Sequence, residues 1–168
     1  MKKILIIMLV CMLVLTGCGK KDETKSGDEK SYLNEPQKET ICFSTFYSSE
    51  QDYRVNNDVT LYSRGGAVLS EKDVDVFKSI NEELRNKYIE RTKNEFERQN
   101  QSYGGTTYVI QINDEKVNVE ANIDYSKYNM KQFMEDYGFT EKDMIDGYVS
   151  LDSLIALYEY FGYTCNKQ

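Results

Sequence analysis

The stretch TYVIQINDEKVNVEANID, residues 107–124, decides the fold. Apolar and polar side chains alternate on both sides of its central triplet, Asn113-Asp114-Glu115. A period of two is typical of a strand with one buried and one solvated face, and a short polar segment between two such strands is typical of a hairpin turn. The stretch therefore predicts an antiparallel hairpin. Its buried face is formed by Tyr108, Ile110, Ile112, Val117, Val119, Ala121 and Ile123.

Two further strands are predicted nearer the N-terminus. Residues 41–47 (ICFSTFY) are rich in aromatic and β-branched side chains, which favour a strand. Residues 53–63 continue in the same way, with Asn56-Asn57-Asp58 predicted as a turn or bulge within them.

A helix is predicted over residues 71–89. Ser70 is placed to cap it, with Asp73 three residues further on as a variant of the capping box. Apolar residues then recur at helical spacing, namely Phe77, Ile80, Leu84 and Tyr88. The charged residues 90–102 either extend this helix or fray from it.

Helices are also predicted after the hairpin. Residues 130–137 form a short amphipathic helix that Gly138 ends, and Thr140 is expected to cap one more turn through Ile145. The last helix follows Ser150 and ends at Gly162. The order β-β-α-β-β-α-α predicts an α+β fold, an antiparallel β-sheet with α-helices packed on one face.

The N-terminus has the features of a lipoprotein signal peptide. A short cationic start precedes an apolar run over residues 4–15, which is too short to span a bilayer. Leu15-Thr16-Gly17-Cys18 resembles the bacterial lipobox, so cleavage is expected between Gly17 and Cys18, with a lipid on the Cys18 thiol. An ordinary secretion signal that happens to contain a cysteine is the alternative.

This leader predicts three parts of the chain. Residues 1–17 are the signal peptide, residues 18–38 are the lipidated cysteine and a disordered charged tether, and residues 39–168 are a single domain. Two acyl chains anchor a protein stably where one is marginal. The predicted location is the cell membrane, with the domain lipid-anchored on the extracytoplasmic face.

Composition excludes several classes of function. The formal net charge is −7, which argues against a nucleic-acid partner, because phosphate contacts need a basic surface. The sequence contains no histidine, so Ser–His and Cys–His catalysis and imidazole zinc sites are excluded. No cofactor and no metal site is predicted.

Acidic residues give weak candidates for a site. A calcium site is weighed at Asp143 and Asp146 with Asp136 and Glu141 nearby, but a solvated acidic face is favoured because the spacing matches no calcium loop. Glu120 and Asp124 do not qualify as a general acid/base pair from sequence. No catalytic residue is therefore assigned.

Tyrosines cluster towards the C-terminus, at Tyr148, Tyr158, Tyr160 and Tyr163. A recognition surface is one interpretation of this cluster, and rings that line the core are the favoured one. The predicted function is a non-enzymatic binding or interaction module for an unknown protein or small ligand. A carboxylate-dependent extracellular hydrolase is the alternative.

Two cysteines remain in the predicted domain, Cys42 in the first strand and Cys165 after the last helix. Exported chains meet oxidising surroundings, so the pair is a disulfide candidate. Two independent buried thiols are the alternative.

The layout as a whole resembles the YehR-like family of bacterial lipoproteins. The segment from Val117-Asn118-Val119-Glu120 to Asp124-Tyr125, the helix that starts at Met130 and the final Phe161-Gly162-Tyr163 carry the resemblance, which covers most of the chain after Lys38. It departs from the family in its long charged segment 90–102 and in the cysteine pair. The resemblance implies an envelope location and a fold, and it transfers no activity.

Overall fold

The structure is a computed structural model that describes residues 34–166. The elements in chain order are β1 (Lys38–Ser48), β2 (Tyr53–Arg64), β3 (Ala67–Ser79), α1 (Glu82–Ser102), β4 (Thr106–Asn113), β5 (Lys116–Asp124), the 3₁₀ turn η2 (Tyr125–Lys127), α2 (Met130–Tyr137), the 3₁₀ turn η3 (Glu141–Asp143), β6 (Met144–Ile145), β7 (Tyr148–Val149), α3 (Leu151–Tyr160) and β8 (Thr164–Asn166). Within this range no helix is both long and apolar enough to cross a membrane.

One antiparallel sheet organises the domain. Its strand order is β4-β5-β3-β2-β1-β8, and β6 and β7 form a separate two-stranded ribbon. The predicted hairpin is the β4–β5 pair, with Tyr108 opposite Ala121 and Ile110 opposite Val119. The α+β fold class predicted from the sequence is confirmed.

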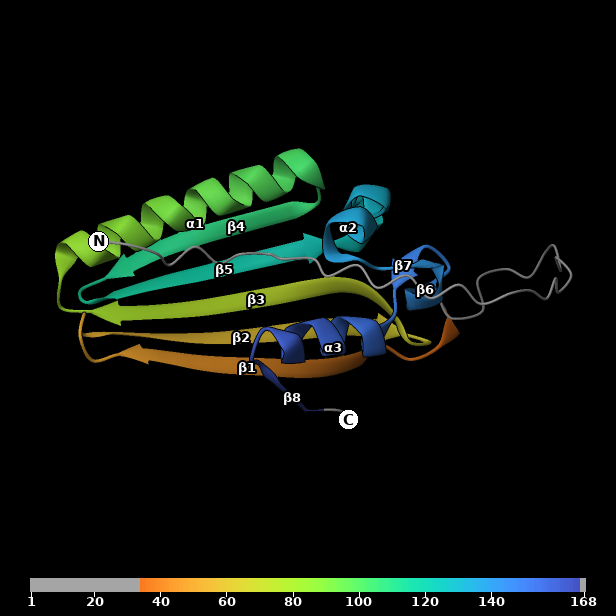
Figure 1. Ribbon diagram of the computed structural model, residues 1–168, viewed down its shortest axis with the longest axis horizontal. Coiled ribbons are helices and arrows are strands. Elements are labelled where there is room, and N and C mark those ends of the chain that lie inside the picture. The colour runs from red at the N-terminus through yellow and green to blue at the C-terminus, as the bar shows by residue number, and fades with distance from the viewer. Residues whose placement is uncertain (1–33, 167–168) are drawn as a thin grey trace, which may run out of the picture.

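The helices pack on one face of this sheet (Figure 1). The strand register places Phe77 opposite Val117, and the helical Phe96 of α1 packs in the same cluster as both. It also places Cys42 opposite Val59 on that same face, where Leu154 of α3 joins them. Figure 1 shows α1 running beside β4 and α3 in front of β1 and β2, with β5 and β3 between the two helices. We call this side of the sheet the covered face and the other side the open face.

The predicted helix over residues 71–89 is wrong in its first half. Residues 67–79 form β3, and α1 begins only at Glu82, where the Asn81 side chain accepts hydrogen bonds from the backbone N–H groups of Glu83 and Leu84. The sequence Glu71–Lys78 alternates between the two faces, and its backbone pairs with β2 on one side and with β5 on the other. Two ladders of strand hydrogen bonds thus outweigh the weak helical spacing of Phe77 and Ile80. The charged residues 90–102 do extend the helix.

Two smaller predictions are also wrong. Asn56-Asn57-Asp58 lies inside the continuous strand β2 and pairs with both neighbours, while the register shift falls at Tyr62/Ser63. The turn after Thr140 ends at Asp143, because Ile145 already pairs with Tyr148 in the β6–β7 ribbon. The other predicted strands and helices are confirmed, including the left-handed Gly138 that ends α2.

A close backbone approach joins α1 to the hairpin. Gly105, with φ of 72°, leads from α1 into β4. A Cβ at this position would lie 2.6 Å from the carbonyl oxygen of Asp124. Any other residue would push apart the end of β5 and the start of β4, so the glycine fixes where α1 returns to the sheet.

Candidate functional site: a row of carboxylates on the covered face

Three acidic side chains lie in a row on the covered face of β3. Glu71, Asp73 and Asp75 alternate along the strand and so point to the same side, as Phe77 does two residues later. Their cross-strand neighbours on this face are mostly apolar, with Val59 and Ala121 on either side of Asp73. We call Glu71, Asp73 and Asp75 the β3 carboxylate row.

Glu71 is the most deeply buried member of the row, with 4% of the residue exposed. The Tyr125 hydroxyl donates to Oε2 at 2.8 Å, and the Tyr158 hydroxyl donates to Oε1 at 2.6 Å. Burial raises the pKa of this carboxyl, and the two hydroxyl donors oppose that rise because they stabilise the charged form. Each Glu71 oxygen therefore has a donor from the protein itself.

Asp75, at the other end of the row, also has its own donors. The Asn57 amide donates to Oδ1, and the Tyr88 hydroxyl donates to Oδ2 at 3.1 Å. Asn57 is held in turn by the hydroxyl of Ser44 on β1. Burial raises the pKa of Asp75, although both donors act to lower it. Asp75 is half-buried, and, as at Glu71, the surrounding elements supply a hydrogen-bond donor to each of its oxygens.

Asp73, in the middle, differs from both. Less than 1 Å² of its Oδ1 is exposed, and within the described residues that atom has no hydrogen-bond partner. Burial raises its pKa well above the ordinary value, and the charge of Asp75, followed by that of Glu71, raises it further. A buried polar atom without a partner destabilises a fold by about 1–3 kcal/mol, and more when the group is charged.

Tyrosines from two helical segments stand around Asp73. Tyr88 comes from α1, while Tyr158 and Tyr163 come from the end of α3 and the turn after it. Tyr88 donates to Asp75 and Tyr158 donates to Glu71, the two neighbours of Asp73 on this face, and Tyr163 packs against Tyr158. Burial is the first cause that raises the pKa of each of the three phenols, and the charge of Asp73 adds to it. Exposed Glu95 of α1 adds another negative charge, which raises the pKa of Asp73 and of Asp75.

No base in the described part of the chain neutralises the row. The ion pairs present there join Lys72 to Glu120, Lys87 to Glu83 and Lys127 to Asp124. Lys72 belongs to β3 but points to the open face, away from its neighbours Glu71 and Asp73. The row is a set of like charges without a counter-ion among residues 34–166.

The arrangement does not fit a metal centre. Alternate residues of a strand stand about 7 Å apart, and calcium needs 6–8 oxygens within about 2.6 Å of one point. Across the residues described, no group of three or more Asp, Glu or Cys side chains is placed to hold an ion. The row contains one acid with an unpartnered acceptor oxygen, Asp73, between two acids whose oxygens already accept hydrogen bonds.

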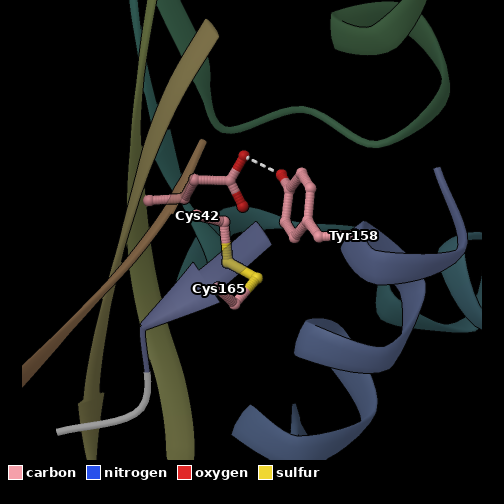
Figure 2. Close-up of a disulfide and its surroundings, with 4 residues drawn as sticks. Cys42, Tyr158 and Cys165 are labelled. Atoms are coloured by element: carbon pink, nitrogen blue, oxygen red, sulfur yellow. Dashed lines mark hydrogen bonds between the residues drawn. A yellow bond between two sulfur atoms is a disulfide. The ribbon is translucent and has the colours of Figure 1, made fainter. Parts of the chain in front are cut away.

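The two cysteines of the predicted domain form a disulfide close to this row (Figure 2). Cys42 of β1 is opposite Cys165 of β8, with an S–S distance of 2.01 Å and a Cα–Cα distance of 4.0 Å. Figure 2 shows the bridge beside Tyr158, whose hydroxyl bonds to Glu71. The disulfide thus ties β8, which follows α3, to the sheet at the level of Asp73.

The other sequence candidates lie elsewhere. Gly17 and Cys18 fall outside the described residues. Asp143 caps the turn at Thr140 and accepts from Ser153, and these donors lower its pKa. Asp136 accepts from Tyr103 and from Gln132, whereas Asp146 and Glu141 are exposed. The four acids that were weighed as a calcium site are therefore not gathered around one point.

Glu120 and Asp124 do not share a cleft either. Glu120 lies on the open face, paired with Lys72 at 3.0 Å, and its pKa is lowered mainly by that contact. Asp124 caps the η2 turn through Ser126 and pairs with Lys127, which lowers its pKa as well. Both are ordinary ionised surface acids.

The C-terminal tyrosines divide between two roles. Tyr148, Tyr158 and Tyr163 pack against the core cluster under α2 and α3, and the rings of Tyr158 and Tyr163 have centroids 5.1 Å apart. Tyr160 is 83% exposed. The preference for core rings is therefore confirmed for these three and wrong for Tyr160, and the Tyr158 hydroxyl also bonds to Glu71 of the row.

The sequence prediction missed the row because residues 71–89 were assigned to a helix. In a helix Glu71, Asp73 and Asp75 would point in three directions, whereas in a strand they share a face. A signal was present: polar and apolar residues alternate from Asp73 to Val76, and Val74 and Val76 are β-branched. On that pattern the acids would have been assigned to the solvated face, so their burial would still not have been predicted.

The sequence matches no protein-family model and no curated protein. Among solved structures, the chain is similar to the NMR structure of the YehR protein of E. coli, with a TM-score of 0.54 and 11% identity over 80% of this chain and 94% of that one. An NMR structure of a protein from Streptococcus pneumoniae TIGR4 matches with a TM-score of 0.45 and 12% identity over 90% of this chain and 99% of that one. At such identity the match to YehR shows a YehR-like fold, as the resemblance implied, and nothing about activity.

Proposed function

We propose that this chain is the precursor of a lipid-anchored protein whose domain stands on the extracytoplasmic face of the cell membrane. In this proposal the domain is a non-enzymatic binding module, and the β3 carboxylate row is its binding site. The chain would then be a lipoprotein of the YehR-like kind in location as well as in fold.

The location is supported by two separate features. The leader ends in Leu15-Thr16-Gly17-Cys18, the pattern of a lipidated and cleaved cysteine. The pair Cys42–Cys165 is oxidised, and disulfides persist in oxidising compartments and are rare in the bacterial cytosol. A domain that is exported and kept at the membrane fits both.

The binding role rests on one observation, the unpartnered Oδ1 of Asp73. Like charges buried side by side lower the stability of a fold unless another molecule neutralises them. Proteins keep such groups where function requires them, so a strongly perturbed acid between two elements is a candidate site.

A carboxylate-dependent hydrolase fits less well. Hydrolysis by carboxylates needs two of them free to act, one as a general acid and one as a base or nucleophile. In the row only Asp73 lacks donors, because Glu71 is held by Tyr125 and Tyr158, and Asp75 by Asn57 and Tyr88. One free carboxylate supports binding better than this chemistry.

Labelling with a fatty acid tests the anchor. Cells that express the full chain should incorporate labelled palmitate into it, and Cys18→Ala should abolish the label. Labelling that persists in Cys18→Ala would contradict the anchoring proposal.

Substitution of Asp73 tests the binding site. Asp73→Asn keeps the shape of the side chain and removes its charge, so we expect the free energy of unfolding to rise by about 1–2 kcal/mol at neutral pH. Urea denaturation measures this change. Asp114→Asn is the matched control, because Asp114 is an exposed acid in the turn between β4 and β5, away from the row. A loss of stability in Asp73→Asn would make Asp73 a structural residue and contradict its role in binding.

A further inference from the structure

We propose that the β3 carboxylate row binds an organic cation that carries N–H donors, a primary ammonium or a guanidinium group, seated on Asp73 between α1 and α3. This inference rests on the proposed binding function and names the chemical class of its ligand. Three properties of the site lead to it: its charge, its missing hydrogen-bond donor and its aromatic rim.

The charge of the site calls for a cation. Glu71, Asp73 and Asp75 lie in sequence on one strand face, and exposed Glu95 of α1 acts on the same place. None of the ion pairs within residues 34–166 includes any of these acids. A neutral or anionic ligand would leave these negative charges uncompensated, whereas a cation would be attracted by each of them.

The ligand must also bring a hydrogen-bond donor. Glu71 and Asp75 show how this surface satisfies a carboxylate, since O–H or N–H groups of the protein reach both oxygens of each. Asp73 has no such donor at its Oδ1. An ammonium or a guanidinium group supplies both the charge and the N–H donors, and such charge-assisted bonds are about twice as strong as neutral ones.

Asp73 is partly accessible even though its Oδ1 is covered. The residue as a whole is partly exposed, and so is Asp75, whereas Glu71 is closed off. A small cationic group at the end of a longer molecule would approach the exposed part of Asp73 and displace the side chains that cover Oδ1.

Aromatic rings held in fixed positions flank this point. Tyr88 stacks on Phe77 with centroids 4.4 Å apart, and Tyr158 meets Tyr163 edge to face. Ring faces attract ammonium and guanidinium groups, and the attraction grows as water is excluded. Packed tyrosines on both sides of one carboxylate suit an organic cation better than a hydrated metal ion.

Titration with small probes tests the proposal on the full processed chain, purified in detergent and ¹⁵N-labelled. n-Butylammonium and n-butylguanidinium chloride should shift the backbone amides of residues 71–75 and of Tyr88 and Tyr163, with saturation. Tetramethylammonium has the same charge and no N–H group, and it should bind at least tenfold more weakly. Asp73→Asn should weaken n-butylammonium binding at least tenfold, and Asp114→Asn should leave it unchanged.

Other results separate the possible failures. Equal binding of tetramethylammonium would overturn the requirement for donors and leave a simple charge site. Calcium chloride that shifts the same amides in an Asp73-dependent way, when the amines do not, would overturn the inference while the binding function stands. If no probe shifts these amides and Asp73→Asn also lowers the free energy of unfolding, the inference and the proposed function both fail.

Discussion

The two ends of the covered face are built on different principles. Under α1 the sheet presents an apolar cluster, in which Phe77, Val117 and Val119 pack against Phe96. Under α3 it presents a larger cluster that also surrounds a buried acid, Glu71, and includes the disulfide half Cys42. At the first end a hydrogen bond from Tyr88 to Asp75 adds to this packing. The second end has a covalent bond on β1 and a buried acid on β3, with β2 between them.

The two ends therefore differ in the balance between apolar burial, which stabilises the domain, and buried acids, which destabilise it. Buried apolar area at the α1 end contributes about 25 cal/mol per Å², and the acid at that end, Asp75, has hydrogen-bond donors to both of its oxygens. At the α3 end some of that gain is offset by the desolvation of Glu71 and Asp73, whose raised pKa values have burial as their first cause. The disulfide lies at the α3 end, where the desolvation of these acids lowers the stability of the fold, so the covalent link offsets part of that loss.

Of the changes predicted here, removal of the disulfide should have the largest effect on the difference in stability between the α1 end and the α3 end. Cys42 and Cys165 are 123 residues apart, and closing a loop of that length contributes about 4–5 kcal/mol in the chain-entropy model. We expect the Cys42→Ala/Cys165→Ala double variant to lose about that much free energy of unfolding, measured by urea denaturation. Native-state hydrogen exchange should show the loss of protection first in β8 and α3, and last in α1.

Two observations would contradict this prediction. One is a count of two free thiols per chain in the denatured, unreduced protein. The other is an equal loss of protection at both ends of the sheet, since that would mean that the α3 end does not depend on the link more than the α1 end does.

The fold was largely predictable because its signals are local. The β4–β5 hairpin alternates over most of residues 107–124, with Val109 as an exposed apolar exception, and α3 has both a polar cap in Ser150 and a final Gly162. Local patterns of this kind indicate periodicity and chain reversal without reference to the rest of the molecule. The one large error, over β3, arose where neighbouring residues carry two periods: Phe77 and Ile80 fit a helix, and the alternation from Asp73 to Val76 fits a strand.

The site was not predictable for a different reason. Glu71 is opposite Leu61 on one side and Ile123 on the other, and its donors Tyr125 and Tyr158 come from segments 54 and 87 residues away. An acid at a strand position is assigned to the solvated face unless its partners are known. The cysteine pair was easier, because only two cysteines remain once residues 1–18 are set aside, so the sequence offered a single pairing.

The pH dependence of the stability of Asp73→Asn should be the smallest of the predicted effects, and it isolates the contribution of the Asp73 charge. The pKa of Asp73 lies above its ordinary 3.8 when the protein is folded, so the folded state holds this proton more tightly than the unfolded state does. At about pH 3, below both pKa values, both states are protonated and the charge has no effect on stability. As the pH rises above the ordinary pKa and towards the folded pKa, the unfolded state loses the proton first, and the wild type loses stability. We therefore expect the advantage of Asp73→Asn to be near zero at about pH 3 and to grow to about 1–2 kcal/mol at neutral pH. Glu71 and Asp75, whose pKa values are also raised, should leave part of the slope in the variant. Urea denaturation of both proteins across this range measures the difference, with Asp114→Asn as the control that should show no such growth. An advantage that stays constant over the whole range would mean that the gain comes from packing and not from the charge.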